Sequence, residues 1–208
     1  MNPFGFELIF GLLSIALHYT ATFKLPSTSL LKDPVQTLSA VVPILFLGHV
    51  VLIISANLLR GNAFNKTIIS LGYSILATLS GVGVLHVLAI LFGASLTEKI
   101  PNTFLFSAYL SIITIMPCFE SFKETAWIKV FVQHSPTTTS EIYAYAQAIC
   151  ALSGAWIGAI VLPLDWDREW QAWPISCVIS TYVGHSVGVL AAFIWSSVKL
   201  LFGKKKSE

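Results

Sequence analysis

Residues 154–177 read GAWIGAIVLPLDWDREWQAWPISC and join two apolar stretches through a short loop that is rich in charges and tryptophans. The charged residues of the loop are Asp165, Asp167, Arg168 and Glu169. Each would cost roughly 2.5–3.5 kcal/mol at the centre of a membrane-spanning helix, so the loop is expected outside the hydrocarbon. Tryptophans next to such a loop are typical of the aromatic belt at headgroup depth. The stretch therefore predicts a hairpin of two membrane helices.

The composition extends this prediction to the whole chain. Of the 208 residues, 55% are hydrophobic and only 11% are charged, whereas soluble proteins have about 25% charged residues. The mean hydropathy is +0.78. A span needs about 20 apolar residues, so this length allows about six. We predict an all-α polytopic membrane protein that forms a single domain, with spans at 4–23, 36–59, 67–92, 102–119, 142–162 and 174–202 and a basic cytosolic tail at 203–208.

Several function classes have no support in the sequence. The net charge is only +2, and its positive part is concentrated at the C-terminus, so nucleic-acid binding is not expected. The cysteines Cys118, Cys150 and Cys177 form no C-x-x-C pair and are interpreted as small core residues. No cofactor is predicted, and the chain leaves almost no length for an aqueous domain with its own active site.

The orientation follows from the basic residues, which collect on the cytosolic side of membrane proteins. The loops and ends on the side of the termini carry eight Lys and Arg residues, and the loops on the other side carry four. Both termini are therefore predicted to be cytosolic and the 165–173 loop lumenal. Asn65-Lys66-Thr67 spells a glycosylation sequon, but this topology places it on the cytosolic side, so a glycan on Asn65 would overturn the orientation.

Two sequence patches resemble one known family. The first consists of GAWIGA at 154–159, PLDWDR at 163–168 and WQAWPISC at 170–177. The second consists of Gly93-Ala94, Glu98, TFLF at 103–106 and Pro117-Cys118. Together they resemble PIG-F, the accessory subunit of the ethanolamine-phosphate transferases of GPI-anchor synthesis, over roughly a quarter of the chain. Asp167 stands where the family usually has Glu, and Glu169 where a Pro is frequent.

The resemblance implies a place and a role. It implies a multi-pass protein of the endoplasmic reticulum membrane that binds membrane lipid and stabilises the separate catalytic subunits, which are PIG-O-like and PIG-G-like proteins. The hairpin is the predicted partner interface or structural centre. Its residues are Gly154, Trp156, Gly158, Pro163, Asp165, Trp166, Arg168, Trp170, Trp173 and Pro174. Trp and Arg dominate binding hot spots, which favours them as anchors.

Lys205 and Lys206 stand four and three places from the end, as in the dilysine retrieval signal of endoplasmic-reticulum proteins. Short basic clusters after a last span also anchor to anionic headgroups. The two interpretations are equally compatible with the residues, and the family resemblance favours retrieval.

Calcium binding and metal-dependent phosphotransfer have little support in these residues. Asp165, Asp167 and Glu169 alternate as in a calcium loop, but the sixth position holds Trp170 where an EF-hand requires Gly. The loop is better interpreted as an interfacial segment in which Arg168 pairs with a neighbouring carboxylate, or as a recognition surface for another chain. A two-metal phosphotransferase needs clustered Asp and His, and the loops predicted to be lumenal contain no His. The chain alone is therefore not expected to catalyse the transfer.

Two features leave alternatives open. Four histidines fall in predicted spans, namely His18, His49, His86 and His185; they could hydrogen-bond between helices or line a proton or substrate path. G-x-x-x-G pairs at 154/158 and 184/188, and a weaker small-residue pair at 77/81, allow close helix approach, either internally or with a partner. The leading hypothesis is a non-catalytic stabilising subunit. The alternative is a small lipid transporter or lipid-modifying enzyme that uses the histidines.

Overall fold

A computed structural model of the chain describes residues 3–122 and 128–204. It is built from six long helices: α1 (Pro3–Phe23), α2 (Pro34–Leu59), α3 (Phe64–Leu91), α4 (Ile100–Ser121), α5 (Thr139–Ile160) and α6 (Ile175–Lys204). Each contains a stretch long and apolar enough to cross a membrane, and the described residues contain no strand. The prediction of an all-α fold with six such helices is confirmed. Where the bilayer begins and ends along each helix stays a prediction.

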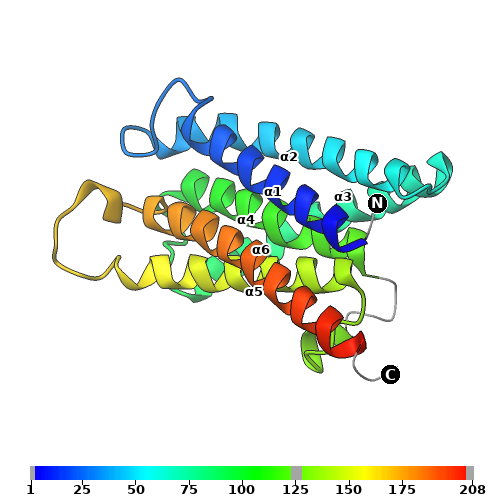
Figure 1. Cartoon of the computed structure of the whole chain (residues 1–208). Helices are drawn as coiled ribbons and strands as arrows, with labels where there is room; N and C mark the ends of the chain where they lie inside the picture. The colour runs from blue at the N-terminus through cyan, green and yellow to red at the C-terminus, as the bar shows by residue number, and fades with distance from the viewer. Residues whose placement is uncertain (1–2, 123–127, 205–208) are drawn as a thin grey trace.

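The helices run back and forth along one bundle axis (Figure 1). The first turn of α1 and the last turn of α6 lie at one end of the bundle. The α1–α2 loop and the α5–α6 loop lie at the opposite end. Because the chain starts and ends at the same end of the bundle, the arrangement agrees with an even number of membrane crossings.

Helix α4 is the central helix of the bundle. It packs against α2, α3, α5 and α6, and a larger share of its apolar stretch is buried than in any other helix described here. Tyr109 and Ile113 of α4 are fully buried against Leu38 of α2 and Val178 of α6. By contrast, α3 exposes a row of large apolar side chains that includes Tyr73, Leu76 and Leu79, as expected for a lipid-facing surface.

Local sequence signals fix two helix starts. Asp33 caps α2 by accepting a hydrogen bond from the backbone N–H of Gln36 at 2.9 Å, and Pro34 occupies the first helical turn. Thr138 and Glu141 form a capping box at the start of α5, which satisfies N–H groups that a helix leaves unpaired. The α5 helix therefore begins a few residues before the apolar stretch that defines the predicted span.

Helices α5 and α6 meet backbone to backbone. A Cβ added to Gly154, Gly158, Gly184 or Gly188 would lie closer than 3.0 Å to backbone atoms of the other helix. The Ser176 hydroxyl donates a hydrogen bond to the carbonyl oxygen of Gly158 at 2.9 Å. Both G-x-x-x-G pairs are therefore used inside the chain, where they bring the two arms of the hairpin into direct contact.

Replacing Gly158 with Ala is expected to destabilise the hairpin, because the new methyl group overlaps backbone atoms that cannot move away cheaply. Overpacking of this kind costs about 1–3 kcal/mol. The thermal unfolding midpoint of the purified chain in detergent should fall. Gly72→Ala in α3 is the matched control, since a Cβ there meets nothing within 4 Å. An equal effect of both changes would contradict the close α5–α6 contact.

Candidate functional site

The loop between α5 and α6, residues 161–174, is called the signature loop below. Gln171 lies in its short 3₁₀ turn, η2 (Glu169–Gln171). The Gln171 side-chain amide donates to the carbonyl oxygens of Val161 at 2.8 Å and Leu164 at 3.0 Å, and its oxygen accepts from the Arg168 backbone N–H at 2.9 Å. One buried glutamine therefore ties the start, the middle and the end of the loop together.

Trp173 anchors the far end of the loop to α4. Its indole N–H donates to the Thr103 hydroxyl at 3.1 Å, and its carbonyl oxygen accepts from the Asn102 amide at 3.3 Å. Its ring meets Phe106 edge-on at 5.2 Å between centroids. Pro174, joined to Trp173 by a cis peptide bond, is buried. The two sequence patches that carry the resemblance, far apart in the chain, thus meet in space.

The remainder of the signature loop faces outward. Pro163, Asp165, Trp166, Arg168 and Trp170 are exposed, and the Trp166 and Trp170 rings lie 5.9 Å apart. Within the described part of the chain, the one ion pair joins Arg60 to Glu7, so Arg168 makes none with a neighbouring carboxylate. The loop therefore exposes the cation of Arg168 and the aromatic pair of Trp166 and Trp170 on a backbone that hydrogen bonds hold in place.

The acidic side chains of the loop do not form a metal site. No group of three or more His, Cys, Asp or Glu side chains among the described residues is placed to hold an ion. Asp167 instead has a left-handed backbone, with φ of 49°. Asp tolerates this conformation better than most residues, which gives the residue at this position a conformational role.

Trp156 lies on a different surface from the signature loop. It is 60% exposed on α5 beside Ile157 and Ile160, which are also exposed. It therefore does not join the cluster formed by Trp166 and Trp170. The two glycines of its motif, Gly154 and Gly158, face α6 on the opposite side of the helix.

Three of the four intramembrane histidines meet in the bundle, which hydropathy alone does not predict. The Nε2 atoms of His18 and His49 lie 2.7 Å apart, and the ring of His185 lies 4.4 Å from that of His18. Ser14 contacts the Nε2 atom of His185 at 3.1 Å. All of these residues are buried, so they tie α1, α2 and α6 together through polar contacts. His86 lies apart, against Phe104.

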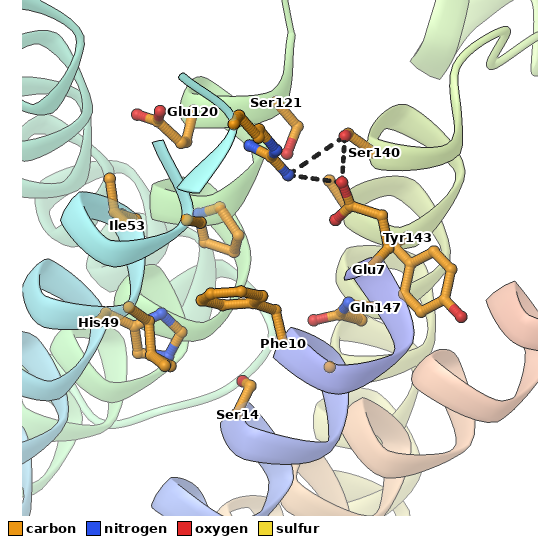
Figure 2. A pocket seen from close by; sticks show the side chains of 16 residues that line it. Glu7, Phe10, Ser14, His49, Ile53, Glu120, Ser121, Ser140, Tyr143 and Gln147 are labelled. Carbon is orange, nitrogen blue, oxygen red and sulfur yellow. Dashed lines mark hydrogen bonds and ion pairs between the residues drawn. The ribbon is translucent and has the colours of Figure 1, made fainter. Parts of the chain in front are cut away.

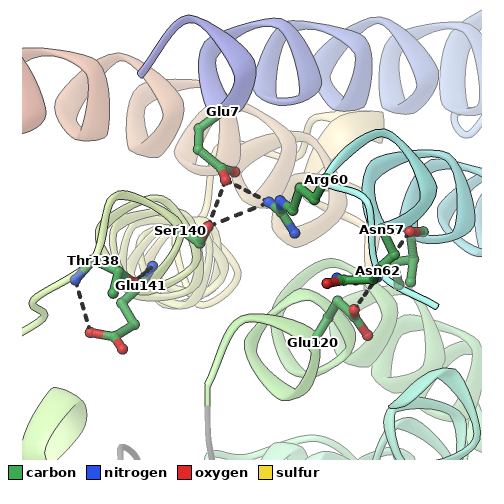
Figure 3. Close-up of polar contacts among 9 residues, drawn as sticks. Glu7, Asn57, Arg60, Asn62, Glu120, Thr138, Ser140 and Glu141 are labelled. Atoms are coloured by element: carbon green, nitrogen blue, oxygen red, sulfur yellow. Dashed lines mark hydrogen bonds and ion pairs between the residues drawn. The ribbon is translucent and has the colours of Figure 1, made fainter. Parts of the chain in front are cut away.

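A polar cavity of about 100 Å³ leads from one end of the bundle toward this cluster (Figure 2). Its polar lining residues are Glu7, Ser14, His49, Arg60, Glu120, Ser121, Ser140, Tyr143 and Gln147. Arg60 and Ser140 both donate to the Glu7 carboxylate (Figure 3). Ionisable groups inside a membrane bundle mark functional sites, and this rule applied to Glu7 and Glu120 could have indicated the cavity.

Comparison with known proteins decides the family. Residues 14–193 match the family model described as GPI biosynthesis protein family Pig-F. The chain belongs to this Pig-F family. It is 30% identical over 190 residues to glycosylphosphatidylinositol anchor biosynthesis protein 11 of Yarrowia lipolytica, which covers 88% of this chain and 82% of that protein. The family predicted from the two sequence patches is confirmed.

Two mammalian relatives carry a more specific name, GPI ethanolamine phosphate transferase, stabilizing subunit. The mouse protein is 38% identical over 114 residues, which are 54% of this chain and 52% of that protein. The human protein is 38% identical over 112 residues, or 53% of this chain and 51% of that protein. The match thus spans about half the length of these relatives. No solved structure matches the chain.

In this Pig-F chain, Gln171 holds the signature loop through its hydrogen bonds to the carbonyl oxygens of Val161 and Leu164. Gln171→Ala removes the two hydrogen bonds that hold residues 161 and 164, and we expect faster amide exchange and faster proteolysis across residues 162–172. Glu169→Ala, at an exposed neighbouring position, is the control. If backbone amides in residues 162–172 exchanged at the same rate in both variants as in the unchanged chain, Gln171 would not be what holds the loop.

Proposed function

We propose that this chain is a non-catalytic subunit of the endoplasmic reticulum membrane that binds and stabilises a catalytic subunit of GPI ethanolamine phosphate transferase. The names of its mammalian relatives support this role. The PIG-O-like and PIG-G-like proteins are the proposed partners. The orientation we propose places both termini in the cytosol and the signature loop in the lumen, as the distribution of basic residues favours.

The observation that carries the proposal is the contrast between the two sides of the signature loop. On its inner side, Gln171 and Trp173 hold the backbone through hydrogen bonds. On its outer side, Trp166, Arg168 and Trp170 are exposed. A rigid loop loses little conformational entropy on binding, and Trp and Arg are the residue types that dominate hot spots.

The retrieval signal proposed at Lys205 and Lys206 lies outside the described residues. It stays a prediction that agrees with residence in the endoplasmic reticulum.

Arg168→Glu combined with Trp170→Ala should lower the abundance of the bound transferase severalfold, with little change in the level of this chain. Hot-spot residues each contribute about 2 kcal/mol or more, and both residues are exposed in the signature loop. Quantitative mass spectrometry of membranes from cells carrying the double change measures both proteins.

The matched control reverses a charge and truncates an apolar side chain in another loop at the same end of the bundle. This control is Lys32→Glu combined with Leu31→Ala, because both residues are exposed in the loop between α1 and α2. Transferase levels that stay unchanged in the signature-loop variant, or fall equally in the control, would count against the proposed interface.

A second candidate, a lipid transporter or lipid-modifying enzyme, draws support from the His18, His49 and His185 cluster beside the cavity. Replacing single histidines distinguishes this candidate from the stabilising-subunit proposal. Under the stabilising-subunit proposal, His49→Ala weakens the chain and its complex together, because a buried hydrogen bond is lost. His86→Ala, away from the cluster, should have less effect. A His49→Ala chain that keeps its complex but abolishes GPI modification would favour the enzyme or transporter.

A further inference from the structure

The cavity of about 100 Å³ opens at one end of the helix bundle, where we expect lipid headgroups. Four helix ends meet there. Glu7 lies in the second turn of α1, Arg60 caps the end of α2, Glu120 is the penultimate residue of α4 and Ser140 is the second residue of α5. Because spanning helices begin and end near the headgroup region, polar groups of lipids are the most concentrated small ligands at this depth.

Glu120 supplies a carboxylate whose charge has no cation beside it among the described residues. Its Oε1 atom accepts from the Asn57 amide, and its Oε2 atom accepts from Ser70 at 2.9 Å and from Ser74 at 3.4 Å. All three donors are neutral, as Figure 3 illustrates for Asn57. The carboxylate is therefore held in place by neutral donors, and no cation among the described residues is paired with it. It is half-buried and lines the cavity.

Across the cavity, Arg60 supplies the opposite charge. Its Nη2 atom donates to Glu7 and Ser140, while no partner within the described residues takes its Nε or Nη1 donors. Among the described residues, the cavity is lined by two carboxylates and one guanidinium, so acidic side chains outnumber basic ones by one. A guest with an ammonium group is therefore favoured first, and an attached phosphate can use the remaining donors of Arg60.

Gln147 adds a further polar group to the lining of the cavity. Its side chain projects into the cavity (Figure 2) and the residue is only 8% exposed. The Gln147 amide has no hydrogen-bond partner within residues 3–122 and 128–204. The amide atoms are not among the fully enclosed polar atoms that lack a partner, so they border the cavity, where water or a guest can reach them. A guest that both donates and accepts hydrogen bonds would satisfy them.

We propose that this cavity binds an ammonium-phosphate zwitterion of the phosphoethanolamine class, with its ammonium group at Glu120 and its phosphate at Arg60. A primary ammonium fits better than a quaternary one. The ammonium end meets a carboxylate, whose oxygens can accept a further charge-assisted hydrogen bond from an N–H donor, whereas quaternary ammonium groups are held by aromatic cages. A volume of about 100 Å³ is of the order of such a headgroup. The source is either the headgroup of phosphatidylethanolamine or free phosphoethanolamine. The site is formed by this chain alone and does not depend on the proposed transferase partner.

The test uses the purified full-length chain without partner, mixed with phosphatidylethanolamine, phosphatidylcholine and phosphatidylglycerol of identical acyl chains. Native mass spectrometry then measures the lipid retained. We expect the unchanged chain to prefer phosphatidylethanolamine over both other lipids. Glu120→Gln should reduce this preference about tenfold, the effect of losing one charge-assisted hydrogen bond. Glu98→Gln, an exposed carboxylate in the α3–α4 loop, should leave it unchanged.

Gln147→Leu is a second variant that is expected to keep the fold, because the Gln147 side chain has no hydrogen bond to lose. The leucine side chain fills part of the cavity and offers no polar group. This variant should also abolish the preference while the thermal unfolding midpoint is kept. Displacement of bound lipid by free phosphoethanolamine would identify the soluble compound as a sufficient ligand; retention of lipid in its presence would identify the phospholipid as the source. Equal retention of all three lipids by the unchanged chain, or an unchanged preference in folded Glu120→Gln and Gln147→Leu chains, would overturn the proposal.

Discussion

The direct backbone contact between α5 and α6 is the constraint on which the other features of the structure depend. Four glycines leave no space for a side chain between the two helices, and in lipid such close approach replaces the hydrophobic effect as the source of helix association. The contact sets the distance that the signature loop must bridge. On α6, His185 packs in turn against His18 of α1, with 4.4 Å between the ring centroids.

The two ends of the bundle are built for different tasks. At one end, Gln171 and Trp173 hold the signature loop while its tryptophans and Arg168 stay exposed, which suits recognition of another protein. At the other end, Glu7, Arg60 and Glu120 surround a small polar cavity, which suits a small charged ligand. The buried histidines lie between these regions. A subunit that binds a partner at one membrane surface and a headgroup at the other would connect lipid with the assembled enzyme.

The sequence predicts the helices well because hydropathy is summed over about 20 residues, and single exceptions change the sum little. It also predicts the exposure of Asp165 and Arg168, since charges are excluded from the hydrocarbon. The sequence does not predict which residues meet across the bundle. Glu7 and Ser140 are 133 positions apart, and Ser14 and His185 are 171 apart. Their meeting depends on helix tilt and rotation. For the same reason, G-x-x-x-G spacing could not reveal whether α5 packs against α6 or against another protein.

The central claim is that this chain exists to bind and stabilise a larger transferase. The most direct measurement is to purify the tagged chain in mild detergent from native membranes and to identify and quantify the proteins that accompany it. The account predicts a stoichiometric large protein with a lumenal phosphotransferase domain. A stable chain recovered without any such protein, carrying only bound lipid, would contradict it.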